Sequence, residues 1–241
     1  LLAEQCAPTL KKMSLELGGN APFIVFDDAD LDAAVEGAMA SKFRNGGQTC
    51  VCANRILVQS GIHDAFVAAL AAKVDALKVG PGTEAGVQIG PMINAAAIAK
   101  IDAHVADALE KGAARATRPR NLPAGFADPV VLSGATVGMR LAREETFGPV
   151  APIFRFETEA EALAIANGTP FGLAAYFYTR DMARAFRFGE ALEAGLVGLN
   201  TGLVSHAEAP FGGVKTSGLG REGAQEGIEE YLETKALHFG G

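Results

Sequence analysis

The chain has no tryptophan and only three cysteines and four histidines among its 241 residues. Three cysteines cannot form a disulfide framework, so we expect a protein of the reducing cytoplasm. The longest stretch without a charged residue, 162–179, is interrupted by Asn167-Gly168-Thr169-Pro170, which predicts no membrane-spanning helix. Lys and Arg number 21 against 28 Asp and Glu, and this acidic balance predicts neither a nucleic-acid nor a membrane partner.

An initiator methionine is also missing. The chain begins Leu1-Leu2-Ala3-Glu4 without a signal-peptide pattern, and we expect it to be part of a longer protein. What the chain has in quantity is apolar residues, at 49%, against 20% charged residues. This composition is typical of a folded globular protein and excludes intrinsic disorder.

Strand-like and helical patterns alternate along the chain, which is typical of an α/β fold. Asp30 is placed to cap a helix in which Leu31, Val35, Met39 and Phe43 recur every fourth residue. We expect strands at 22–26, 55–59, 130–132, 150–154, 173–178 and 196–200. We expect further helices at 62–77, 95–111, 158–166 and 181–193. The Arg- and Pro-containing segment 112–128 predicts an exposed loop or edge strand, and the alternating tail 231–238 predicts a terminal strand.

The segment Asn45-Gly46-Gly47-Gln48-Thr49-Cys50 lies between a predicted helix and a predicted strand, where a glycine-rich turn can present a side chain into a cleft. A nucleophilic cysteine needs a polar setting that lowers its pKa, and backbone N–H groups can provide it. Spacing alone leaves a buried structural cysteine as an equal alternative for Cys50. Cys50 and Cys52 have no second ligand pair, so no metal site is predicted.

Glu16 stands between Leu15 and Leu17, just before the pair Gly18-Gly19. A partly desolvated carboxylate has a raised pKa and suits a general base, although an ordinary surface Glu is the more common outcome for such a pattern. The segment Gly218-Leu219-Gly220-Arg221-Glu222-Gly223 matches the dinucleotide pattern GxGxxG, but no strand leads into it and only 18 residues follow. We therefore predict turns beside a short helix there. The four histidines show no partner pattern and are expected to be structural or solvated.

Taken together, these segments resemble the aldehyde dehydrogenase superfamily over essentially the whole chain. Leu15–Gly19 resembles its glutamate signature, Phe43–Cys50 with Arg55 resembles its cysteine signature, and 144–150, 210–215 and 217–218 follow in family order. Within the superfamily the closest resemblance is to the succinate-semialdehyde dehydrogenases. The segments that carry it are 41–45, 48–55, 200–205, 218–223 and 228–233.

The resemblance implies a catalytic domain with a parallel-rich sheet flanked by helices, without the N-terminal nucleotide-binding domain. Residues 1–18 would end that nucleotide-binding domain, 19–217 would form the catalytic domain, and 218–241 would be a returning segment with an oligomerisation strand. It further implies that the full-length protein is a homo-oligomer, a dimer or tetramer, and that this fragment is inactive alone.

The resemblance also implies roles for individual residues. Cys50 would attack the aldehyde as a thiolate, and after hydride transfer to NAD or NADP, Glu16 would activate the water that hydrolyses the thioester. The remaining residues would bind cofactor or substrate: Glu145, Phe147 and Leu17 the cofactor, Arg44 and Ser205 the distal carboxylate of a small semialdehyde, and Phe211 the aldehyde channel. Cys52 would be a weak candidate for a redox switch.

The residues leave three points open. The sequence distinguishes neither NAD from NADP nor succinate semialdehyde from glutarate semialdehyde. A cofactor-independent thiol esterase needs only Cys50 and Glu16, and it remains an alternative. A non-catalytic assembly module that uses the terminal strand is the third possibility.

Overall fold

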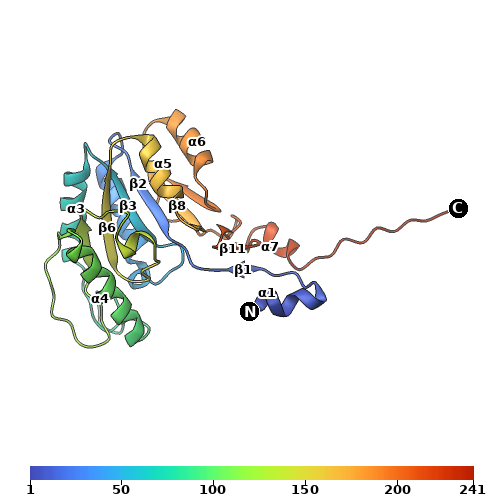
Figure 1. Cartoon of the computed structure of the whole chain (residues 1–241), viewed down its shortest axis with the longest axis horizontal. Helices are drawn as coiled ribbons and strands as arrows, with labels where there is room; N and C mark the ends of the chain where they lie inside the picture. Colours follow the sequence, from blue (N-terminus) through green and yellow to red (C-terminus); the bar gives the residue numbers. More distant parts are fainter.

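The computed structural model describes residues 1–241, and its largest unit is a seven-stranded sheet with the order β4-β5-β6-β3-β2-β8-β9 (Figure 1). Every neighbouring pair is parallel except β4 and β5. The strands are β2 (Ala21–Val25), β3 (Ala53–Gln59), β4 (Ala114–Arg115), β5 (Val130–Ser133), β6 (Val150–Phe156), β8 (Ala174–Tyr178) and β9 (Leu196–Leu199). The expected α/β fold with a parallel-rich sheet is confirmed.

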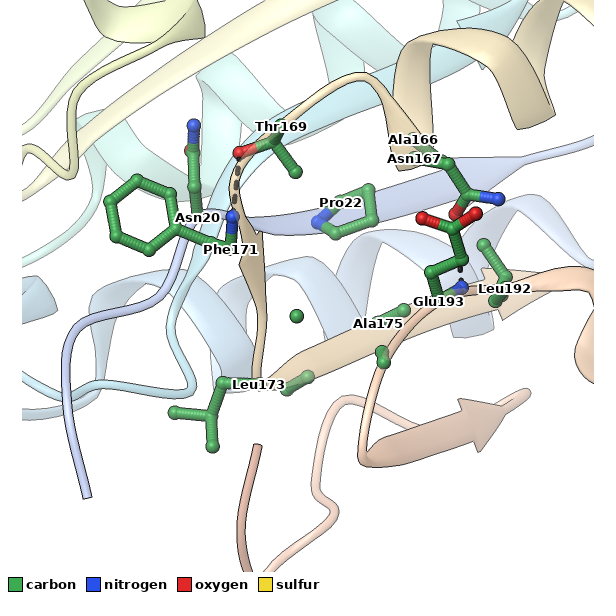
Figure 2. Close-up of a pocket in the computed structure, with 13 residues that line it drawn as sticks. Asn20, Pro22, Ala166, Asn167, Thr169, Phe171, Leu173, Ala175, Leu192 and Glu193 are labelled. Carbon is green, nitrogen blue, oxygen red and sulfur yellow. Dashed lines mark hydrogen bonds between the residues drawn. The ribbon is translucent and has the colours of Figure 1, made fainter. Parts of the chain in front are cut away.

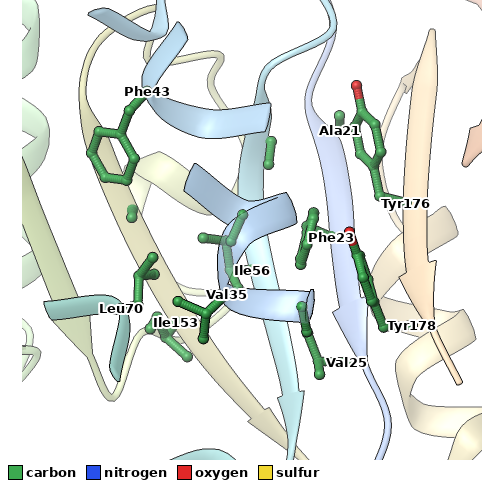
Figure 3. Close-up of a cluster of buried hydrophobic side chains, with 14 of the residues drawn as sticks. Ala21, Phe23, Val25, Val35, Phe43, Ile56, Leu70, Ile153, Tyr176 and Tyr178 are labelled. Carbon is green, nitrogen blue, oxygen red and sulfur yellow. The ribbon is translucent and has the colours of Figure 1, made fainter. Parts of the chain in front are cut away.

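Helices cover both faces of this sheet. On one face, Val35 of α2 and Leu70 of α3 pack on Phe23 and Ile56 of the strands (Figure 3). On the other face, the helices α4, α5 and α6 bury their apolar residues against a second cluster that includes Phe177. The helix bounds are α2 (Leu31–Phe43), α3 (His63–Asp75), α4 (Ala95–Glu110), α5 (Glu159–Asn167) and α6 (Met182–Ala191). The strands alternate their side chains between the two clusters, as period-2 geometry requires.

Side-chain caps explain where several helices begin. Asp30 accepts a hydrogen bond from the Ala33 N–H at 3.1 Å, and Thr158 accepts one from the Glu161 N–H at 3.2 Å. Asp181 accepts from the Ala183 N–H at 2.8 Å, so α6 begins where the sequence predicted. Each cap satisfies a backbone N–H that has no partner within its helix.

Two small antiparallel sheets lie beside the main one. β1 (Leu15–Glu16) pairs with β11 (Gly218–Leu219), and β7 (Phe171–Gly172) pairs with β10 (Val214–Lys215). Figure 1 shows β1, β11 and α7 leading away from the helix-covered sheet. The remaining short elements are α1 (Leu2–Cys6), α7 (Glu226–Glu229) and three 3-10 turns at Ala7–Thr9, Arg44–Gly47 and Arg140–Ala142. The short helix predicted beside 218–223 is present as α7, but Gly218 and Leu219 form strand β11 where turns were expected. No helix has the length and apolar character that crossing a membrane would require.

The tail 231–238 forms no strand within the single chain and extends away from the sheet (Figure 1). Because a strand needs a partner edge for its backbone groups, the expected terminal strand, paired with another subunit or with another part of the protein, stays a prediction. The expectation of an exposed loop or edge strand at 112–128 is confirmed by the edge strand β4, although two of the arginines there are only partly exposed. Arg115 pairs with Asp128, and Arg120 donates to the Leu77 carbonyl at 2.7 Å.

Candidate active site

The loops that precede β2, β3 and β6 meet at one edge of the sheet, because these neighbouring strands are parallel and begin at the same edge. The loops carry Gly18-Gly19, Cys50, and the pair Glu145 and Phe147, respectively. A Cβ atom at Gly19 would lie 2.6 Å from the carbonyl oxygen of Cys50, and one at Gly18 would lie 3.0 Å from Glu145 Oε2. The structure therefore brings together three segments that are far apart in the sequence.

Cys50 is half-buried at this edge, and its surroundings favour the neutral thiol. Burial raises the pKa of Cys50, the carboxylate of Glu16 raises it further, and the N–H groups of Cys50 and Val51 act in the opposite direction. The N–H groups that could lower this pKa are present, but burial and the facing carboxylate outweigh them. Tyr176 of β8 stabilises this loop, because its hydroxyl donates to the Val51 carbonyl at 2.7 Å.

Glu16 is the carboxylate that faces Cys50. Both of its carboxylate oxygens are buried, and neither accepts a hydrogen bond of normal geometry. Burial raises the pKa of Glu16, and the negative charge of Glu222 raises it further, while Arg221 acts in the opposite direction. Of the two alternatives that the sequence left for Glu16, the structure therefore favours the partly desolvated carboxylate with a raised pKa over the more common surface Glu.

The tertiary structure adds Glu222 and Arg221 to the surroundings of Glu16, which the sequence did not predict. The backbone of Phe211 exchanges two hydrogen bonds with that of Glu222, at 2.8 and 2.7 Å. A Cβ atom at Gly212 would lie 3.0 Å from Arg221 Cδ and 3.1 Å from Glu16 Oε1, so all three residues share one point of the site. The motif around Gly218 to Gly223 was visible in the sequence, but nothing there indicated that it approaches residue 16.

Glu145 and Phe147 come from the loop before β6. The Gly19 N–H donates to Glu145 Oε1 at 2.9 Å, and burial raises the pKa of Glu145. Phe147 is about one-third exposed and has a positive φ of 57°, which is rare for a bulky residue. Leu17 lies next to this region with an exposed side chain, and its N–H donates to the Ser217 carbonyl at 3.0 Å.

Arg44 follows the last residue of α2 and is exposed, with no ion pair or hydrogen bond to its guanidinium. It lines an open groove of about 450 Å³ together with Met39, Phe43 and Leu203. Ser205 is exposed two residues beyond Leu203, and no hydrogen bond joins it to Arg44. Phe211 is half-buried and packs on the same apolar cluster as Cys50. The groove therefore combines a mainly apolar lining with the free guanidinium of Arg44, and the Glu36 carboxylate that also lines it pairs with Lys73.

A second hollow, shown in Figure 2, lies between Asn20, Pro22, Phe171 and Leu173. Its volume is about 10 Å³, which is no more than the space for one water molecule. A semialdehyde cannot enter it, so the open groove at Arg44 is the better candidate for a substrate channel.

Two buried groups lie just behind the Cys50 loop. Cys52 is buried with its Sγ atom 2.7 Å from Thr49 Oγ1, and all three cysteines of the chain are free. The Lys42 side chain is fully buried and its Nζ atom has no hydrogen-bond partner, a feature that the sequence did not predict. No group of three or more Asp, Glu, His or Cys side chains is arranged to hold a metal ion.

Comparison with known proteins adds the family to this geometry. Residues 1–237 match the model of the aldehyde dehydrogenase family. The chain is 59% identical over its whole length to half of a glutarate-semialdehyde dehydrogenase from Pseudomonas aeruginosa. It is 58% identical, over 99% of its length, to half of the succinate-semialdehyde dehydrogenase [NADP(+)] GabD from Escherichia coli.

A solved structure gives the same result. The crystal structure of an aldehyde dehydrogenase from Brucella melitensis biovar abortus matches with a TM-score of 0.95 and 65% identity, covering 97% of this chain and 48% of that one. The chain thus spans about half the length of the curated relatives and the solved structure that it matches.

Proposed function

Because the chain belongs to the aldehyde dehydrogenase family, we propose that it supplies the thiol and the base for oxidising a carboxylate-bearing aldehyde to the acid. Succinate semialdehyde and glutarate semialdehyde are the substrates named for the two relatives above. The observation that carries the proposal is the meeting of Cys50, Glu16 and Glu145 at one edge of the sheet.

In the first step, the Cys50 thiol attacks the aldehyde carbon. An S–C bond forms, the thiol proton passes to Glu16, and the carbonyl electron pair moves to the oxygen. The raised pKa of Glu16 suits it to accept this proton, since its burial favours the neutral form. The N–H groups of Cys50 and Val51 donate to no backbone carbonyl and lie close to the Cys50 thiol, and we propose that they stabilise the oxyanion.

The loops at this edge fit the ribose of a nicotinamide nucleotide. The Glu145 carboxylate stands beside Gly18, where any side chain would crowd Oε2, and an acceptor-only carboxylate suits ribose hydroxyls. We propose that Glu145 holds the ribose and that Phe147 and Leu17 pack near the nicotinamide. NAD or NADP, when bound, supplies the acceptor for the two electrons of the oxidation.

Loss of the aldehyde hydrogen as hydride to the bound nucleotide would convert the adduct into a Cys50 thioester, and hydrolysis of this thioester completes the reaction. Once Glu16 has released the thiol proton to solvent, it takes a proton from a water molecule, the water oxygen bonds to the thioester carbon, and the S–C bond breaks. Cys50 leaves as a thiolate and the acid is released. Glu222 raises the pKa of Glu16 and Arg221 lowers it, so we propose that these two residues tune the basicity of Glu16.

Substrate selection is assigned to the groove at Arg44. Its guanidinium has no protein partner and offers two parallel N–H donors to the distal carboxylate. Ser205 would add a hydroxyl from the loop that carries Leu203, and Phe211 would line the path to Cys50. An uncharged aldehyde of the same length would lack the partner for Arg44.

The proposal extends to the protein as a whole. Residues 1–18, 19–217 and 218–241 would be the end of a nucleotide-binding domain, the catalytic domain and a returning segment. We also propose a cytoplasmic homo-oligomer whose nucleotide is NAD or NADP, the latter named for one relative. The 241-residue chain alone is expected to lack aldehyde oxidation.

The test uses the full gene product with succinate semialdehyde and each nucleotide, measuring reduction at 340 nm. Cys50→Ala should abolish the signal, while Cys6→Ala should retain it, because Cys6 lies in α1 away from the sheet edge. Cleavage of p-nitrophenyl acetate without nucleotide tests the esterase alternative. Turnover of the ester with no nucleotide reduction by the wild type would favour that alternative instead.

A further inference from the structure

We propose that His104 is a positioning residue that holds the Glu145–Phe147 turn in the conformation needed by the nucleotide. The inference rests on the proposed function. His104 lies in α4 and its side chain is fully buried. It reaches neither Cys50 nor the groove at Arg44, so its effect must pass through the turn that it contacts.

The turn needs support because its backbone is strained. Phe147 has a φ of 57°, a left-handed conformation that is unfavourable for a bulky residue. Such a conformation persists only where the surrounding structure over-determines it. The next residue, Gly148, lies against α4, since a Cβ atom there would be 2.4 Å from Ile101 Cδ1.

The His104 ring ties together the two residues on either side of Glu145. Its Nε2 atom lies 3.1 Å from Glu144 Oε2, and its Nδ1 atom lies 3.1 Å from Thr146 Oγ1. Ile101 and His104 are three residues apart, on the same face of α4. Helix α4 thus contacts the turn at Glu144, Thr146 and Gly148.

The protonation state of the ring follows from its partners. Arg140 donates two hydrogen bonds of 3.0 Å to Glu144, which remains ionised and can only accept. His104 Nε2 therefore carries the hydrogen. Burial disfavours a charged ring, so Nδ1 is unprotonated and accepts from the Thr146 hydroxyl.

Asn54 completes the clamp from β3. Its Oδ1 atom accepts from the Thr146 N–H at 3.2 Å, and its Nδ2 atom donates to the Glu144 carbonyl at 3.1 Å. Residues 144 and 146 are therefore held by backbone and side chain together. Only Glu145 and Phe147 remain directed toward the sheet edge, where Glu145 accepts from Gly19.

The test compares three variants of the full gene product. His104→Phe removes both hydrogen bonds while keeping a planar ring, and Thr146→Val removes only the bond to Nδ1. Thr146→Ser keeps the hydroxyl and is the matched control. Amide hydrogen exchange over residues 145–147 reports on the turn, and calorimetric titration with NAD+ and NADP+ reports on binding without turnover.

We expect His104→Phe and Thr146→Val to speed exchange at 145–147 and to weaken nucleotide binding about tenfold, which corresponds to about 1.4 kcal/mol. Thr146→Ser should match the wild type, and ester cleavage by Cys50 should stay within twofold in all three. If His104→Phe does not fold, Thr146→Val decides the question. Unchanged exchange, or faster exchange with unchanged binding, would overturn the inference. A wild type that binds nucleotide but oxidises no semialdehyde would count against the proposed function alone.

Discussion

A side chain at Gly19 would collide with the backbone of Cys50, because its Cβ atom would lie 2.6 Å from the Cys50 carbonyl oxygen. The absence of a Cβ atom at one loop therefore permits the position of the thiol in another. The two loops precede neighbouring parallel strands, so a shift of one changes the other.

This contact predicts the effect of Gly19→Ala. The Cys50 loop must move, and we expect a loss of at least tenfold in ester cleavage and a stability cost of about 1–3 kcal/mol from overpacking. Gly90→Ala is the matched control, since no atom lies within 4 Å of a Cβ atom there. Steady-state kinetics and thermal unfolding are the measurements. Equal activity of the two variants would contradict the argument.

The Glu16 carboxylate faces the Cys50 thiol, and this contact predicts that Glu16→Gln lowers the pKa of Cys50. A negative charge disfavours the thiolate, so its removal favours ionisation, although the larger effect of burial remains. The pH dependence of iodoacetamide labelling should shift to lower pH in the variant, while hydrolysis of the acyl enzyme slows at least 100-fold because the base is lost. A midpoint that stays in place or rises would show that the two groups do not interact.

The free guanidinium predicts a selective effect of Arg44→Gln. A hydrogen bond to a charged group contributes about 1.5–3 kcal/mol, so KM for succinate semialdehyde should rise roughly 10- to 150-fold. KM for an uncharged aldehyde such as butanal should change less than twofold. Arg118→Gln is the control, because Arg118 is exposed and pairs with Asp75 away from the groove. An equal rise for both aldehydes would indicate a general disturbance of the site.

Glu144 predicts a pH-dependent part of stability. Its pKa is lowered to about 2 by Arg140 and His104, from an ordinary value of 4.5. Because the folded-state pKa is the lower one, this stabilisation is present above about pH 4.5 and is lost as the pH falls toward 2. Thermal unfolding should show a higher Tm for the wild type than for Glu144→Gln at pH 7. This difference in Tm should shrink between pH 4.5 and 3. A constant difference over this range would mean that the ion pair does not stabilise the fold.

The buried amine of Lys42 predicts an increase in stability for Lys42→Met. Its Nζ atom has no hydrogen-bond partner, burial lowers its pKa, and an unsatisfied buried polar group costs about 1–3 kcal/mol. Methionine fills nearly the same volume without that cost. Denaturant unfolding should show the gain, and Lys73→Met, at an exposed lysine, should show little change. A less stable Lys42→Met protein would mean that the amine has a favourable partner.

The sequence alone was sufficient for the order and type of the main elements, because each depends on local chemistry. Caps such as Asp30 and Thr158 act within one turn of the chain, and short apolar runs bounded by turn residues indicate the buried strands. The segments around Glu16 and Cys50 were also visible, since each lies within a few consecutive residues.

Only the tertiary structure decided which of these residues meet. Parallel strands place Gly19, Cys50 and Glu145 at one edge, and the return of the chain brings Glu222 beside Glu16. Burial, which raises the pKa of Cys50 against the effect of the backbone N–H groups, is a property of the packed molecule, as are the contacts that His104 makes with Glu144 and Thr146. The tail 231–238 shows the same dependence, because alternation provides the pattern of a strand but another edge must provide its hydrogen bonds.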